Sequence, residues 1–505
     1  MSRTRSAFLG TISSQIYVII SVLFNLFSVP IIIRHLNSEV YGMSIVIFQI
    51  TAYLGMFDFG LTAGVERYLV GTKDNTDENK ELIKRILSTC LIVYIFIAVI
   101  VIIAGNIFGL FAARIFNISS KYNIQGIISI ISIVFGLQII LRAIAGIFFA
   151  HQRQLLSNTL SFILNISSIL TVIIFVTLGY GLWSFVYSTI ICFILNVTLN
   201  IFFFRKYYPF VEFKIKYYDN SLLKEMFSYG FSLFIIGIAA QIIFQTDRIL
   251  IGYFVSLVAV SIYSITTKIP ELMTQFLWKI TDNAFPGIIE AVKSDSKSFA
   301  KIHDNLMRIT ISLSTVGFWF ILVASYPFIK LWVGKNYYAG NFFLISVVYL
   351  YFIQHTFIHV TSMCLSAAGI VKRISIIYIT EALINIVISI ILVKRYNIMG
   401  VVYGTIISGL ITSVWFTPAI AIKYMNSNVI TYIISILKPI LLSSFPGIIL
   451  YFMFNNLFAG INNWFTLIFY SIIFLSASML PIVYINRSLL KSFSNKYKSY
   501  KTTCK

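Results

Sequence analysis

Charged side chains lie inside the apolar runs of this chain, where they could bind a charged group within a membrane. Residues 241–290 place Asp247, Arg248, Lys268 and Glu271 in two hydrophobic segments. An ionisable group at bilayer depth is costly unless it faces protein or water, so such a group indicates a functional site. We therefore expect the rest of the chain to hide these charges from lipid.

Lys268 is the strongest candidate for binding an anion. It lies about ten residues into its apolar segment, which places it near the bilayer midplane at about 1.5 Å of rise per residue. Pro270 removes a helix hydrogen bond, and this predicts a kink. Glu271 shares a helix face with Lys268 and could tune or compete for the bound group. The alternative is a structural ion pair between helices, which apolar residues could replace at lower cost.

Two further cations could either line a cavity or extend to the membrane surface. Arg248 lies nearer the outer face, so snorkelling with Asp247 as its partner is an equal alternative. Arg142 lies about two turns from the cytoplasmic side and could reach either a cavity or the lipid headgroups.

Other polar residues could form a gate or couple transport to an ion. Glu66 and Arg67 follow the sequence DFGLTAG, whose Gly60 and Gly64 allow close helix packing or a hinge. A gate and an interfacial ion pair are both open for this pair. Glu381 lies in the middle of an otherwise apolar segment, where it could carry a coupling proton or pair with a cation.

Two histidines lie on one face of a predicted helix. His355 and His359 are spaced i, i+4 beside Gln354. No third ligand has the spacing of a metal site, so we expect no metal and no other cofactor. His359 could hydrogen-bond a sugar or carry a coupling proton, or both histidines could make polar contacts between helices.

The elements that position these residues belong to an integral membrane protein. Of 505 residues, 59% are apolar and 11% are charged, and the mean hydropathy is +0.90. Soluble domains carry about twice that fraction of charged residues. The net charge of +21 comes from basic residues in short loops rather than on one soluble face. We therefore expect topology, and not nucleic acid, to explain it.

A membrane-spanning helix needs about 20 apolar residues. This rule predicts fourteen spans, of which 41–58 and 258–278 could run on into the amphipathic sequence after them. The spans are 12–33, 41–58, 86–109, 124–148, 158–178, 182–204, 228–251, 258–278, 306–326, 341–366, 374–393, 398–421, 430–452 and 464–485. Most Lys and Arg fall on the side that holds both termini, including the tail from Arg487 to Lys505. The positive-inside rule places both termini in the cytoplasm.

The two halves of the chain repeat each other. VYSTII at 186–191 matches VYGTII at 402–407, and Asn165 matches Asn385. Asp58 and Glu66 likewise match Asp282 and Glu290, so these carboxylates are interpreted as architectural. Six spans per half predict a parallel repeat about an axis along the membrane normal. The expected domains are an N-lobe at 1–215, a C-lobe at 216–425, and two added helices with a basic tail at 426–505.

The sequence has no motif of a known enzyme class. It lacks a Walker A loop, G-x-S-x-G and H-E-x-x-H, so an ATP-driven pump and the common hydrolases are not expected. A secondary transporter or flippase that moves one six-helix half against the other fits the repeat.

Residues 29–69, VPIIIRHLNSEVYGMSIVIFQITAYLGMFDFGLTAGVERYL, resemble the opening of the polysaccharide-transporter branch of the multidrug/oligosaccharidyl-lipid/polysaccharide superfamily, the Wzx-type O-antigen flippases. Residues 246–270 look like the matching segment of the second half, although Ser261-Ile262-Tyr263 replaces the Gly-x-Tyr that is usual there. The family-like positions are Arg34, Tyr41, Gly42, Asp58, Gly60, Asp247, Arg248 and Tyr263. The resemblance implies fourteen helices in two lobes around a cationic central cavity.

The resemblance also implies a function in a bacterial cytoplasmic (inner) membrane. The implied substrate is an undecaprenyl-diphosphate-linked oligosaccharide that crosses from the cytoplasmic to the periplasmic leaflet. From their own positions in the apolar segments we expect Lys268 and Arg248, with Arg142 as a third candidate, to hold the diphosphate or acidic sugars. A proton or sodium gradient would drive the cycle. Partners would be membrane lipids, a polysaccharide polymerase and a chain-length regulator. The alternatives are a multidrug exporter of the same superfamily and a membrane glycosyltransferase or ligase.

Overall fold

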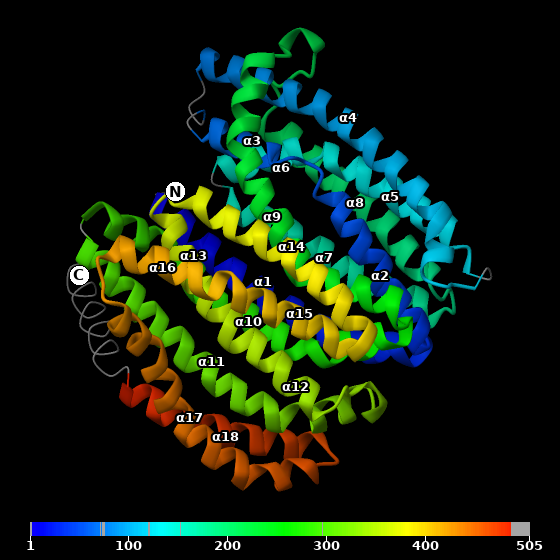
Figure 1. Cartoon of the computed structure of the whole chain (residues 1–505). Helices are drawn as coiled ribbons and strands as arrows, with labels where there is room; N and C mark the ends of the chain where they lie inside the picture. Colours follow the sequence, from blue (N-terminus) through cyan, green and yellow to red (C-terminus); the bar gives the residue numbers. More distant parts are fainter. Residues whose placement is uncertain are drawn as a thin grey trace. The chain divides into compact units, whose positions relative to one another are not determined.

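The computed structural model describes residues 3–70, 72, 76–119, 122–151, 153–294 and 296–485, and the regular structure in these ranges is helical throughout (Figure 1). Contacts between residues divide the chain into two compact units, residues 1–261 and 262–505. The basic tail after residue 485 lies outside the described residues.

Unit 1 holds the first seven predicted spans and the beginning of the eighth. Its helices are α1 (Arg3–His35), α2 (Ser38–Gly55), α3 (Leu61–Leu69), α4 (Asp77–Ile115), α5 (Ile124–Ile140), α6 (Arg142–Ala150), α7 (Gln154–Thr177), α8 (Trp183–Tyr207), the short 3-10 helix η2 (Ile215–Tyr217), α9 (Asn220–Phe254) and the start of α10 (Leu257–Ser294). A core of buried side chains joins α3, α4 and α6 and includes Leu61, Tyr94 and Phe148.

Unit 2 holds the remaining spans. After α10 come α11 (Ser296–Trp332), the 3-10 helix η3 (Lys335–Tyr337), α12 (Asn341–Val348), the π-helix η4 (Tyr349–His355), α13 (Thr356–Ala367), α14 (Val371–Tyr396), α15 (Ile398–Ile411), α16 (Ser413–Met425), α17 (Val429–Ala459) and α18 (Trp464–Ile485). Aromatic side chains such as Phe454, Phe458 and Phe474 form the core between α11, α17 and α18.

The predicted all-α membrane fold is confirmed, and each of the fourteen predicted spans falls on one helix or one string of helices. Ten helices in the described ranges are long and apolar enough to cross a membrane, and two shorter apolar helices cover 19–35 and 464–480. The other two predicted spans, 41–58 and 258–278, fall in α2 and α10.

The predicted spans 41–58 and 258–278 could each continue as a helix into the sequence that follows, and the structure shows different outcomes for the two. The span at 41–58 does not continue, because Phe59 and Gly60 adopt left-handed backbone conformations, with φ of 52° and 76°, between α2 and α3. Such a turn ends a right-handed helix. The eighth span does continue, since α10 extends to Ser294 and is unbroken at Pro270.

Within each half, a polar contact joins two consecutive helices that contain the matching segments. In unit 1, Ser188 of α8 lies 2.8 Å from the Thr171 hydroxyl of α7. In unit 2, Asn385 of α14 donates a hydrogen bond of 2.9 Å to Thr405 of α15. Ser188 and Thr405 lie in the matching segments VYSTII and VYGTII, at adjacent rather than equivalent positions. The predicted domain boundaries after residues 215 and 425 stay a prediction.

Candidate functional site

Arg142 is held by an ion pair at the start of α6. Its Nη1 lies 3.2 Å from Oδ2 of Asp58, and its Nη2 donates a hydrogen bond of 2.6 Å to the Gly55 carbonyl oxygen. The side chains of Arg142 and Asp58 are 36% and 15% exposed. In this structure the guanidinium therefore fastens the end of α2 to α6.

Asp58 also shapes the turn between α2 and α3. Its carboxylate accepts hydrogen bonds from the Gly60 amide at 2.9 Å and from the Thr62 hydroxyl at 2.8 Å. The Thr62 hydroxyl lies 3.0 Å from the hydroxyl of the fully buried Tyr94 in α4. These contacts agree with the architectural interpretation of Asp58.

A seam of close backbone contacts joins α3 to the first half of α9 (Figure 1). A Cβ atom added at Gly60 would collide with the backbone of Gly230, and one added at Gly230 would collide with the carbonyl of Gly60. A Cβ at Gly64 would lie 2.8 Å from Cβ of Met226. The sequence left packing and a hinge open for Gly60 and Gly64, and the structure supports close packing.

The same seam continues along α2 to the other end of α9. The Tyr53 hydroxyl lies 2.6 Å from the Thr246 hydroxyl and donates to the Gln241 carbonyl oxygen at 3.1 Å. Near the far end, the Ser261 hydroxyl donates to the Ser38 carbonyl oxygen at 2.5 Å. Val46 lies against Gly252 near the end of α9, so residues 46–68 line α9 in antiparallel order, and Ser38 lies against the start of α10.

The predicted gate pair, Glu66 and Arg67, belongs to α3. Glu66 is half-buried beside Gly146 of α6, whereas Arg67 is exposed. Neighbouring residues of a helix point in different directions, so the two side chains leave α3 on different faces. Tyr68, one residue further, donates a hydrogen bond of 3.0 Å to Glu225 of α9.

Asp247 and Arg248 are both buried in α9, with 4% and 8% of their surface exposed. Nη1 of Arg248 donates a hydrogen bond of 2.8 Å to Oε1 of Gln245, one turn earlier. This burial favours an internal role for Arg248 over snorkelling to the membrane surface.

Lys268 and Glu271 lie on α10 in unit 2, and both are half-buried. Oε1 of Glu271 accepts a hydrogen bond of 3.2 Å from the hydroxyl of Tyr351 in η4. Helices of the π type are rare and are frequent at functional sites. Tyr351 was not a candidate from the sequence, because one tyrosine in an apolar run does not stand out in a chain with 30 tyrosines.

His359 belongs to a cluster of polar and aromatic side chains between α10 and α13. Its Nε2 lies 3.1 Å from Oδ1 of Asp282, and its ring stacks on Trp278 at 4.4 Å between centroids. Lys279 donates to Oδ2 of Asp282 at 3.2 Å. Sequence reasoning missed Trp278 and Lys279, although the i, i+3 spacing of Lys279 and Asp282 was a usable signal. His355 is buried in η4 rather than in this cluster.

Glu381 is buried in α14, with 2% of its surface exposed. It lies against Thr412 and Ser413 at the break between α15 and α16, where the Ser413 amide can hydrogen-bond its carboxyl group. Its Oε2 has no hydrogen-bond partner in the described part of the chain. Gln354 of η4 approaches the same place at Gly409. A carboxyl in this position can hold a proton or pair with a small cation.

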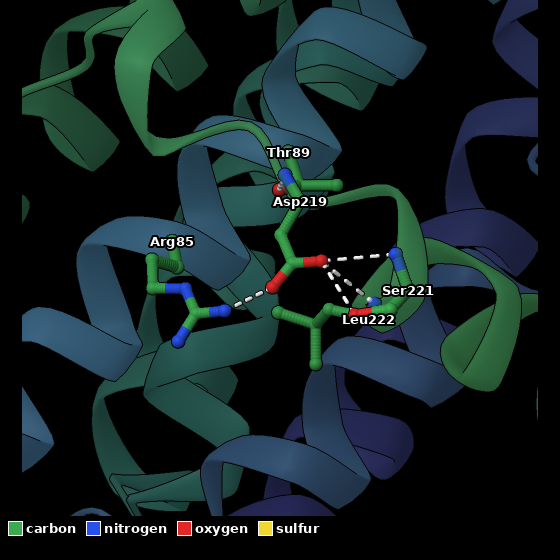
Figure 2. A network of polar contacts seen from close by, with 5 residues as sticks. All are labelled: Arg85, Thr89, Asp219, Ser221 and Leu222. Atoms are coloured by element: carbon green, nitrogen blue, oxygen red, sulfur yellow. Dashed lines mark hydrogen bonds and ion pairs between the residues drawn. The ribbon is translucent and has the colours of Figure 1, made fainter.

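A polar network outside the apolar segments fixes the start of α9 (Figure 2). Asp219 accepts hydrogen bonds from the Ser221 and Leu222 amides, pairs with Arg85 of α4, and donates its own amide to Thr89 at 3.0 Å. Hydrogen bonds from Ser221, followed by those from the Leu222 amide and Arg85, lower the pKa of Asp219 to about 2. The carboxylate therefore stays charged at every physiological pH.

The predicted site residues thus fall into two sets, one in each unit. Arg142, Asp247, Arg248, Glu66 and Arg67 lie in unit 1, whereas Lys268, Glu271, Glu381 and His359 lie in unit 2. Their assignment to a substrate cavity or a gate stays a prediction. Among the described residues, no group of three His, Cys, Asp or Glu side chains could hold a metal ion.

Comparison with known families finds a match over more than half of the chain. Residues 31–341 match the model of a family described as "Polysaccharide biosynthesis protein". This match confirms the resemblance expected from residues 29–69 and 246–270.

Two relatives carry names of transporters rather than of enzymes. A candidate O-antigen transporter of Shigella flexneri is 20% identical over 382 residues, which cover 74% of this chain and 88% of the relative. A candidate O-antigen export protein of Yersinia pseudotuberculosis is 20% identical over 417 residues, covering 79% and 92%.

Solved structures share the fold. The lipid II flippase MurJ in an inward closed conformation superimposes with a TM-score of 0.69 at 16% identity, covering 95% of this chain and all of MurJ. An inward-facing multidrug resistance transporter of the MATE family has a TM-score of 0.55 at 14% identity, covering 81% and 96%.

Proposed function

The chain belongs to the polysaccharide biosynthesis protein family, and from this premise we propose that it is a flippase for lipid-linked oligosaccharides in the bacterial cytoplasmic membrane. The substrate would be an undecaprenyl-diphosphate-linked O-antigen or capsule unit, moved from the cytoplasmic to the periplasmic leaflet. The names of the two relatives and the fold shared with the lipid II flippase support this class. By the predicted topology, both termini are cytoplasmic.

The burial of Arg248 is the observation that carries the proposal. A cation with 8% of its surface exposed inside an apolar helix is costly unless it serves an anion or a built polar site. A diphosphate needs such cations to leave water, because charge-assisted hydrogen bonds replace its hydration. Lys268 of α10 is proposed as the second contact. Arg142 would join them only after releasing Asp58, to which it is paired here.

Replacement of Lys268 by Ala tests the proposal. We expect loss of surface polysaccharide while the protein remains in the membrane at its normal level. Lys438→Ala is the matched control, because Lys438 is also a lysine inside a span but is exposed on α17. Normal polysaccharide in the Lys268 variant would reject the assignment. Drug efflux without any effect on polysaccharide would favour a multidrug exporter instead.

We propose alternating access driven by a proton or sodium gradient, with Glu381 as the coupling group. Its burial and its place beside the break at Thr412 support a carboxyl that gains and loses a cation. Glu381→Gln keeps the shape and the hydrogen-bonding capacity toward Ser413 but removes the charge. We expect this variant to fold normally and to lose gradient-driven transport. Gradient-dependent transport at the wild-type rate would exclude Glu381 from coupling.

A polysaccharide polymerase and a chain-length regulator are the proposed partners, because a unit delivered to the periplasmic leaflet must be consumed there. Glu66, Arg67, Asp247, Glu271 and His359 are proposed as gate or coupling residues. Among them, His359 has its ring in contact with Trp278 and Asp282.

A further inference from the structure

A groove between α16 and α17 has the form of a lipid-binding site. Its volume is about 640 Å³, within the range of about 300–1,000 Å³ that small-molecule sites occupy. Its walls are apolar side chains of both helices, among them Val414, Trp415, Ile433 and Leu437. None of the residues proposed for substrate binding, gating or coupling lines it.

The floor of the groove is fixed by buried contacts. Tyr432 is 3% exposed, and its hydroxyl lies 2.9 Å from the Thr361 hydroxyl of α13. Its ring stacks on that of His303 in α11 at 5.5 Å between centroids. Because three helices hold Tyr432, the groove is a built feature of unit 2 rather than a gap that one side-chain rotation would close.

The groove has one polar end. Lys423, Asn426 and Ser427 line it where α16 gives way to α17, and no Asp or Glu is among its lining residues. Residues 414–423 of α16 and 429–437 of α17 line the rest, which corresponds to roughly 12 Å of apolar length at 1.5 Å per residue. By the predicted topology, the polar end lies on the cytoplasmic side.

This arrangement fits an amphiphile with an anionic head. The exposed ammonium of Lys423 can meet a phosphate, while the Asn426 amide and the Ser427 hydroxyl can hydrogen-bond its oxygens. The exposed ring of Trp415, 66% accessible, and the neighbouring aliphatic side chains can cover an acyl chain. Lipid is also the solvent that faces these helices.

We propose that this groove holds an anionic glycerophospholipid of the cytoplasmic leaflet, with its phosphate at Lys423 and one acyl chain between α16 and α17. The lipid is a resident of the fold and not the transported molecule. It would join α16 to the added helix pair α17 and α18.

The test is lipid retention by the purified full-length protein, measured by native mass spectrometry. Delipidated protein is offered phosphatidylglycerol or phosphatidylcholine with identical acyl chains. We expect phosphatidylglycerol to be retained more tightly, and Lys423→Gln to reduce that preference about fivefold, the effect of one lysine near an anionic headgroup. Lys372→Ala, an exposed lysine at the start of α14 that is outside the groove, should leave the preference unchanged.

A second variant tests the apolar part. Ala419→Trp places a large ring in the groove and should remove the retained lipid, whereas Leu441→Trp, on exposed α17 surface outside the groove, should not. If Ala419→Trp does not yield folded protein, the Lys423 comparison decides alone. Equal retention of the two phospholipids, or an unchanged preference in Lys423→Gln, would overturn the proposal. So would displacement of phosphatidylglycerol by an equal concentration of undecaprenyl phosphate. These outcomes are independent of transport activity.

Discussion

The contact between Gly60 and Gly230 makes the sharpest prediction, because it can be isolated by one added methyl group. Gly230 lies within α9, where alanine is favoured over glycine by about 1 kcal/mol. The added Cβ would collide with the Gly60 carbonyl, and both partners are backbone that no side-chain rotation can move. Overpacking of this kind costs about 1–3 kcal/mol. We therefore expect Gly230→Ala to lower the free energy of unfolding by up to about 2 kcal/mol, after subtraction of the alanine gain.

Gly237→Ala is the matched control on the same helix. A Cβ there would lie 3.3 Å from Cε of Met56, which is the end of a flexible side chain. Met56 can give way at little cost, so this variant keeps the alanine gain and should be neutral or slightly stabilised. The alanine gain cancels between the two variants, and their difference of about 1–3 kcal/mol measures the collision alone.

The measurement is thermal unfolding of both purified variants in detergent, read from the protein that remains monodisperse after heating. Surface polysaccharide is scored in parallel in cells. If closure of the seam belongs to the transport cycle, Gly230→Ala should lose polysaccharide and Gly237→Ala should retain it. Equal melting temperatures for the two variants would falsify the close packing on which this argument rests.

Three further predictions address the charged groups. For the ion pair between Asp58 and Arg142, Asp58→Asn and Arg142→Gln should each destabilise the protein. In a double-mutant cycle the two replacements should show a coupling energy of about 0.5–3 kcal/mol. Additive effects would mean that the pair is not formed. At the start of α9, Asp219→Ala should unfold at a lower temperature than Asp219→Asn, because Asn still caps the helix, and equal melting temperatures would contradict the capping role. The pKa of Asp219 is lowered to about 2, so its contribution is complete above about pH 4 and is lost as the pH falls toward 2. A wild-type melting temperature that falls more steeply with acid over this window than that of Asp219→Asn would confirm it, and parallel curves would count against it.

The fold was predictable because its main determinant is local. Lipid requires every backbone polar group to be satisfied within the segment, so a run of about 20 apolar residues has one outcome, and all fourteen predicted spans coincide with helices. The sequence left open whether the second span ends at residue 58, because the break at Phe59 and Gly60 depends on left-handed backbone conformations, and the Asp58 carboxylate accepts the Gly60 amide there. A hydropathy rule contains no information about such a turn.

From the sequence, the site could be predicted only as a list of residues that are unusual within apolar segments. Arg248, Glu381 and His359 were found because charge or imidazole inside an apolar run is conspicuous. The residues beside Glu381 and His359, Thr412 and Trp278, were not found, since hydroxyls and aromatic rings are common in such runs. The pairing of Arg142 with Asp58 joins residues 84 positions apart on different helices. Long-range pairing of this kind is set by packing, which no spacing rule contains.

The contrast between recurring and unique charges bears on where a substrate could bind. Asp58 and Asp282 occupy equivalent places in the repeat, and each is paired with a base of its own half, Arg142 and Lys279. Two locally neutralised carboxylates add little net field to a cavity. Arg248 and Lys268 have no such recurrence, and both lie on the consecutive helices α9 and α10. A single diphosphate needs only one set of charge-assisted contacts, so the cations proposed to bind it need not recur in both halves.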